Sequence, residues 1–98
     1  MMVYIDQDFA SIVPRYLKNI ENQVLKIDQL LKHNKFKEIE RLSIQIRDSG
    51  ENYGFLMIGQ LGLQLIFYSG LEASAKIKST ITAILDYINN CEIKYIEL

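Results

Sequence analysis

The sequence contains only one cysteine, one proline and one histidine, and it has no tryptophan. The single cysteine, Cys91, cannot form a disulfide within the chain, which favours a reducing compartment. Glycine is also scarce, while 49% of the residues are hydrophobic, and this composition excludes a disordered or fibrous chain. The 98 residues are enough for one domain, residues 1–98, with a single hydrophobic core.

The sequence has no excess of charge of either sign. Eleven lysine and arginine residues stand against 12 aspartate and glutamate residues, which gives a formal net charge of −1. Because nucleic-acid-binding surfaces are normally basic, we expect no nucleic-acid partner.

A long hydrophobic run is missing too. The longest apolar stretch, residues 55–70, is interrupted by two glutamines and three glycines, and it is shorter than the roughly 20 apolar residues that a spanning helix needs. The N-terminal residues, "MMVYIDQD", contain acidic side chains and no signal-peptide pattern. We therefore expect a cytoplasmic protein that does not associate with a membrane.

Apolar residues recur at helical spacing in four long segments. These segments are residues 13–32, with Pro14 in the first turn, and residues 35–53, 55–69 and 72–90. Gly54 and Gly70 are typical stop signals for the second and third segments. A shorter helix is expected over residues 5–13, where Asp6 or Asp8 would favour the N-terminus. The sequence therefore predicts an all-α fold, an antiparallel up-and-down four-helix bundle with a short N-terminal helix.

The C-terminal residues, "EIKYIEL", leave two alternatives open. Ile93 and Tyr95 alternate with Lys94, which is the spacing of a strand. This strand could pair with "MVYI" near the start of the chain, or the segment could continue the preceding helix.

One residue of segment 35–53 is out of place. The inward stripe of this helix is expected to contain Phe36, Ile39, Leu42, Ile46, Gly50 and Tyr53. Ile44 lies on the opposite, charged side, among Lys37, Glu40, Arg41, Arg47, Asp48 and Glu51. A single exposed hydrophobic residue is common, so Ile44 alone does not indicate a site.

The next helix makes Ile44 more informative. The inner face of segment 55–69 is expected to contain Ile58, Leu61, Gly62, Leu65 and Tyr68, which places Leu56, Leu63, Ile66 and Phe67 on or near the outer side. An exposed apolar area of more than a few hundred Å² usually marks an interaction site. The alternatives are that this choice of inner face is wrong or that a terminal segment covers the outer side.

Residues 44–55 resemble a motif of the histidine phosphotransfer (HPt) domain family. In that family the third helix carries a run like H-x-L-K-G-S-G, followed in one subgroup by x-x-Y-G-F. The corresponding residues here are "IQIRDSG" and "ENYGF". The segments "IDQDFASIVPRYLKN", "LGLQL" and "LDYI" are similar to other parts of the same subgroup, so the resemblance covers nearly the whole chain.

The resemblance implies that Ile44 occupies the position of the phosphorylated histidine. Isoleucine has no nucleophile that could attack an aspartyl phosphate. The lysine of the family, which helps to neutralise the phosphoryl group, is Arg47, and the glycine that lets the partner approach is Asp48. A carboxylate a few ångström from a phosphoryl group costs on the order of 1 kcal/mol even in water. We therefore expect a site that has lost phosphotransfer.

The resemblance further implies an interaction module of two-component signalling. It would bind a response-regulator receiver domain or a histidine kinase without carrying phosphate, and we expect neither enzymatic activity nor a cofactor or metal. The expected partner-binding residues are Ile44, Arg47, Asp48, Glu51, Leu56, Leu63 and Phe67.

Two other functions remain open from the sequence. The first is a structural homodimer that forms through the same apolar face. The second is active phosphotransfer through His33, the only histidine, although a histidine near the end of a helix commonly just complements the helix dipole.

Overall fold

Four helices make up most of the chain in the computed structural model, which describes all 98 residues. The helices are α1 (Val13–Leu31), α2 (Phe36–Asn52), α3 (Leu56–Gly70) and α4 (Ser74–Asn90). They agree with the four predicted segments to within about two residues at each end. None of the four helices combines the length and the hydrophobicity that a membrane-spanning helix requires.

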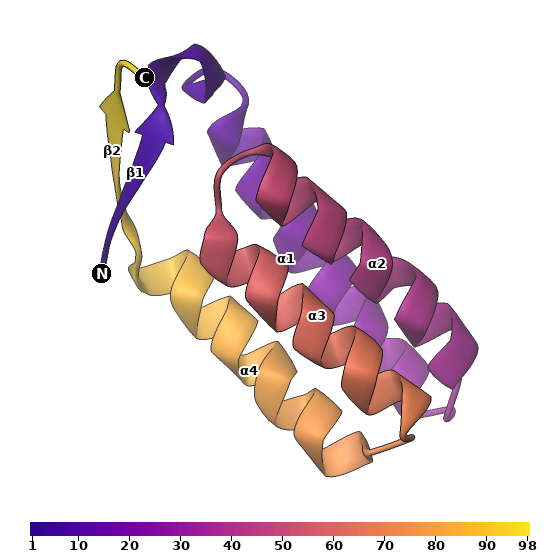
Figure 1. Ribbon diagram of the computed structural model, residues 1–98. Helices are drawn as coiled ribbons and strands as arrows, with labels where there is room; N and C mark the ends of the chain where they lie inside the picture. The colour runs from indigo at the N-terminus through magenta and orange to yellow at the C-terminus, as the bar shows by residue number, and fades with distance from the viewer.

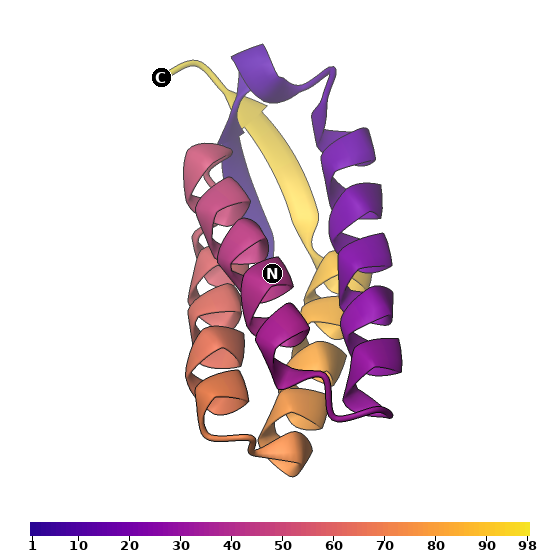
Figure 2. The same cartoon turned by 90° about the vertical axis from the view of Figure 1, so that its right-hand side faces the viewer.

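The helices form an antiparallel bundle in which each helix packs against two others (Figures 1 and 2). Helix α1 lies between α2 and α4, and α3 completes the ring between the same two helices. The molecule is elongated along the bundle, with extents of 42 × 21 × 18 Å. The predicted up-and-down four-helix arrangement is therefore confirmed.

The apolar stripes of the four helices supply the core, because residues at three- and four-residue spacing share one face of a helix. The apolar helical residues that are at most 2% exposed are Val13, Ile20, Val24 and Ile27 from α1, Ile39 and Ile46 from α2, Ile58 and Leu65 from α3, and Ile77, Ile81 and Ile84 from α4. Aliphatic β-branched side chains predominate, and Phe55 in the α2–α3 connection is the largest fully buried side chain. The predicted inner faces are confirmed, α3 included.

The turns follow the expected chemistry in part. Pro14 lies in the first turn of α1, and Gly54 has a φ of 82°, a left-handed conformation that ends α2. Gly70 was predicted to stop the helix after residue 69, but it is the last residue of α3 and does not have the left-handed conformation. Glu72 takes that role in the α3–α4 connection, with a φ of 52°.

The N-terminal segment differs from the prediction. Residues 5–13 do not form a regular α-helix: only one 3-10 turn is present, Gln7–Phe9, and strand β1 (Met2–Asp6) precedes it. Asp6 caps this turn, because its side chain accepts a hydrogen bond of 3.0 Å from the backbone N–H of Asp8. Ile5 is 1% exposed, and this burial in extended backbone overrides the local helical pattern.

The two ends of the chain pair as strands, which resolves the alternatives for the C-terminal segment. Strand β2 (Glu92–Ile96) runs parallel to β1, with Val3 opposite Ile93 and Ile5 opposite Tyr95. The parallel direction follows from the bundle. Strand β1 turns back into α1, while β2 continues the direction of α4, which is antiparallel to α1 (Figure 1). The fold is thus mostly helical, with a small parallel sheet that the all-α prediction omitted.

Candidate docking surface

The candidate surface is formed by the outer sides of α2 and α3, and glycines determine how closely these helices approach. A Cβ atom added to Gly50 would lie 2.5 Å from the backbone nitrogen of Gly59, and one added to Gly62 would lie 2.7 Å from the backbone nitrogen of Arg47. Such distances are far shorter than normal van der Waals contacts. At these positions the two backbones lie so close that only the hydrogen atom of a glycine side chain fits between them. The outer residues of both helices therefore belong to one continuous surface.

Sequence reasoning missed this helix–helix contact as a feature of the site. It assigned Gly50 and Gly62 only to inward stripes and gave no role to Gly59. The pattern Gly59-Gln60-Leu61-Gly62 was the available signal, because glycines three residues apart lie on the same side of a helix.

Ile44 lies on the outer side of α2, as predicted, and its side chain is 37% exposed. It precedes Arg47 by one helical turn, and Arg47 packs against Gly62. Since α2 and α3 are antiparallel, the turn that contains Ile44 lies beside the part of α3 that follows Gly62, which includes Leu63 and Phe67. Helical geometry therefore brings Ile44 next to the apolar residues of α3.

The outer side of α3 is uncharged and mostly apolar, with Gln60 and Gln64 as exposed polar residues. Leu56 is 69% exposed, and Leu63 and Phe67 are each 54% exposed. Ile66 is half-buried, and no charged residue occurs between Phe55 and Leu71. The terminal strands therefore do not cover this face, and the choice of inner face for α3 was right.

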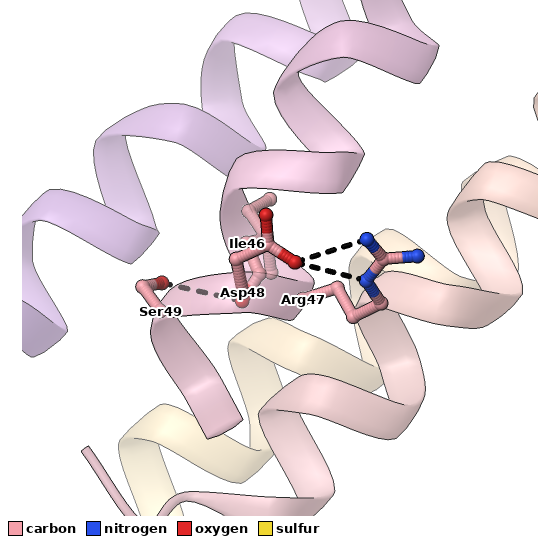
Figure 3. A network of polar contacts seen from close by, with 4 residues as sticks. All are labelled: Ile46, Arg47, Asp48 and Ser49. Carbon is pink, nitrogen blue, oxygen red and sulfur yellow. Dashed lines mark hydrogen bonds and ion pairs between the residues drawn. The ribbon is translucent and has the colours of Figure 1, made fainter. Parts of the chain in front are cut away.

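Arg47 and Asp48 form an ion pair beside this apolar surface (Figure 3). The Nε and Nη2 atoms of Arg47 donate hydrogen bonds of 3.1 and 3.0 Å to the same carboxylate oxygen of Asp48. The Arg47 side chain is 33% exposed and that of Asp48 is 54% exposed. The guanidinium of Arg47 is thus already paired with the carboxylate of its neighbour.

The remaining predicted residues lie at the edge of the surface or away from it. Glu51 is exposed on α2, and its side chain lies next to Gly59, 3.2 Å from where a Cβ of that glycine would be. His33 is exposed in the α1–α2 connection, before the start of α2. Eight residues of helix separate Phe36 from Ile44, which is about 12 Å at 1.5 Å per residue, so His33 is not part of the docking surface.

Comparisons with protein-family models, curated proteins and solved structures found no match to this chain. The resemblance to HPt domains therefore depends on the motif residues themselves.

Proposed function

We propose that this protein is an HPt-like docking module that binds a response-regulator receiver domain or a histidine kinase without carrying phosphate. The observation that carries the proposal is the position of Ile44. It is exposed on α2 where the resemblance places the phosphorylated histidine, and α2 packs against α3, which carries the exposed apolar residues Leu63 and Phe67.

The chemistry around Ile44 supports binding without phosphotransfer. Isoleucine has no lone pair for attack on an aspartyl phosphate. The guanidinium of Arg47 is held by Asp48 at 3.0 Å, so a phosphoryl group there would have to compete with a carboxylate for the cation. Two negative groups a few ångström apart repel each other.

The distribution of polarity also fits a docking surface. Protein interfaces commonly have an apolar centre surrounded by a polar rim. Leu56, Leu63 and Phe67 supply the apolar centre on α3, and the exposed charged residues Arg41 and Glu51 of α2 supply part of a rim.

The first test measures binding to purified receiver domains and histidine kinases from the source organism by titration calorimetry. We expect a complex with at least one of them, and we expect Leu63→Glu to weaken it at least about tenfold, because hot-spot residues contribute about 2 kcal/mol or more. Leu25→Glu is the matched control: Leu25 is 47% exposed, but it lies on α1, which does not pack against α3. A complex that both variants weaken equally would place the docking surface elsewhere.

The second candidate function, a homodimer through the same face, is favoured by the lack of charge on the outer side of α3. Sedimentation of the purified protein distinguishes the two functions. A dimer that dissociates in Leu63→Glu, together with no binding to any receiver or kinase, would replace the docking proposal with the structural one.

A further inference from the structure

A second feature lies on the other side of α2, away from α3. A groove of about 370 Å³ runs between α1 and α2. Its polar side chains include Arg15, Asn19 and Gln23 of α1 and Gln45 and Ser49 of α2. None of these residues belongs to the docking surface, so the groove is a separate feature of the molecule.

Two hydrogen-bonded bridges between α1 and α2 hold the groove open. Gln23 donates a hydrogen bond of 3.1 Å from its amide nitrogen to the amide oxygen of Gln45. Ser49 donates a hydrogen bond of 3.2 Å to the phenol oxygen of Tyr16. On α1 the bridges are seven residues apart, which is about 10 Å of helix. Two side-chain hydrogen bonds therefore bridge α1 and α2 along the groove.

The groove is rich in hydrogen-bond donors and has no carboxylate. Arg15 is its only charged residue; it is exposed at the groove and forms no ion pair within the protein. The side chains of Asn19 and Tyr53 also lack hydrogen-bond partners in the protein, although both line the groove. A cation without a counter-ion, among neutral donors, fits an anion that offers acceptor oxygens.

The aromatic residues that line the groove indicate which chemical group the rest of the ligand would contact. The rings of Tyr16 and Tyr53 have their centroids 4.8 Å apart, and Tyr16 is only 7% exposed. Burial raises the pKa of Tyr16 to about 12, so its phenol stays neutral and does not repel an anion at neutral pH. Both rings line the same groove as Arg15.

The volume limits the size of the ligand. The groove corresponds to about a dozen waters at ~30 Å³ each, which is within the range of small-molecule sites, ~300–1,000 Å³. One arginine matches one negative charge. We propose that the groove binds a small organic monocarboxylate, with its carboxylate on Arg15, its body against Tyr16 and Tyr53, and its polar substituents on the amides of Asn19, Gln23 and Gln45.

The test is a titration of isotope-labelled protein with para-hydroxybenzoate, followed by amide chemical shifts. We expect saturable chemical-shift changes in two ranges only. These are residues 12–23, which include the first part of α1, and residues 45–53, which include the last part of α2. The neutral analogue para-hydroxybenzamide should bind about tenfold more weakly or not at all, because it cannot form the charged hydrogen bonds with Arg15. This readout does not depend on any receiver or kinase, so it stands or falls separately from the docking proposal.

A pair of variants makes the test specific. Arg15→Gln should weaken para-hydroxybenzoate binding about tenfold or more. The matched control Lys26→Gln should bind as the wild type does, because Lys26 is exposed on α1 but does not line the groove. Equal binding by Arg15→Gln and wild type, or equal binding of the acid and the amide, would overturn the proposal. So would the absence of saturable shifts with para-hydroxybenzoate, benzoate and butanoate up to about 10 mM, a concentration at which even weak sites fill.

Discussion

A Cβ atom on Gly62 would lie 2.7 Å from the backbone nitrogen of Arg47 and 2.9 Å from its Cα. The atoms in the way belong to the backbone of α2, so no rotation of a side chain can relieve the contact. This relationship fixes the distance between α2 and α3, and with it the position of Ile44 beside the apolar side of α3.

The first prediction is that Gly62→Ala destabilises the protein. Alanine should gain up to about 1 kcal/mol of helix propensity over glycine, but overpacking against a backbone costs about 1–3 kcal/mol. We expect a net loss in the free energy of unfolding, measured by urea denaturation. Gly70→Ala is the control, since a Cβ there has no neighbour within 4 Å, and it should leave stability unchanged or raise it slightly. Equal effects of the two variants would mean that α2 and α3 are less tightly packed than described.

The second prediction is that restoring phosphotransfer takes more than a histidine. Ile44→His alone should accept phosphate from a phosphorylated receiver poorly, because Asp48 repels the phosphoryl group and occupies Arg47. Ile44→His with Asp48→Gly should accept it faster, as measured by acid-labile, base-stable label on the chain.

Two controls complete this experiment. Ile44→His with Asp48→Ala keeps helix propensity and removes only the carboxylate, so it separates charge from space. The wild type should remain unlabelled, and label that disappears in His33→Gln would support the alternative that His33 carries phosphate. Equal rates for the single and double variants would show that Asp48 is no obstacle.

The third prediction concerns the terminal sheet. Ile5 is 1% exposed and lies near Gly54, whose Cβ would be 3.6 Å from the Ile5 Cδ1 atom. Ile5→Ala should therefore lower the free energy of unfolding by about 2–5 kcal/mol. Tyr4, the neighbour of Ile5 in the same strand, is 58% exposed. Tyr4→Ala should therefore lower the free energy of unfolding by much less. Denaturation of both variants distinguishes a sheet that is part of the cooperative core from strands that fray independently.

The fourth prediction is a loss of stability in alkaline solution. Burial raises the pKa of Tyr16 and of Tyr87 from 10.0 to about 12. The folded state therefore keeps these protons where the unfolded state releases them, so their contribution is complete below pH 10 and is lost as the pH rises towards 12. Tyr16→Phe, which cannot ionise, should flatten this part of the stability–pH curve. A titration followed by tyrosinate absorbance should show tyrosines that ionise above pH 10 in the wild type, and one fewer such tyrosine in Tyr16→Phe.

The helices could be predicted because their signals are local. The inward apolar residues of α1 and the end of α2 at Gly54 depend only on neighbours along the chain. The inner face of α3 could be assigned as well, although this helix is nearly all apolar, because Gly62 and Leu65 lie on the same side of it. The segment around Ile5 could not be assigned in the same way. Its backbone pairs with that of Tyr95, 90 residues later in the chain; the alternation of Ile93 and Tyr95 left this pairing open, but no local pattern decided it.

The candidate site was predictable in position but not in detail. The sequence placed Ile44, Leu56, Leu63 and Phe67 on the outer sides of their helices, and the exposed fractions agree. It could not show that Arg47 is paired with Asp48, because residues next to each other in a helix normally point apart. The groove between α1 and α2 was also missed, since it depends on contacts such as Tyr16 to Ser49 between distant segments.

The last prediction separates the apolar face of α3 from the core. Leu63 and Phe67 are each 54% exposed, so Leu63→Glu with Phe67→Lys removes little buried area, and such surface changes usually alter stability by about 0.5 kcal/mol or less. The introduced acid stands four residues before the introduced base, an orientation that stabilises a helix by about 0.2–0.5 kcal/mol. We therefore expect an unchanged helical circular-dichroism spectrum and a cooperative melt, together with loss of any association through this face. Leu65→Glu is the contrasting variant: Leu65 is 0% exposed, and an unpaired charge in the core should unfold the protein. If the double variant unfolds as Leu65→Glu does, then Leu63 and Phe67 support the core and the docking surface has been assigned to the wrong side of α3.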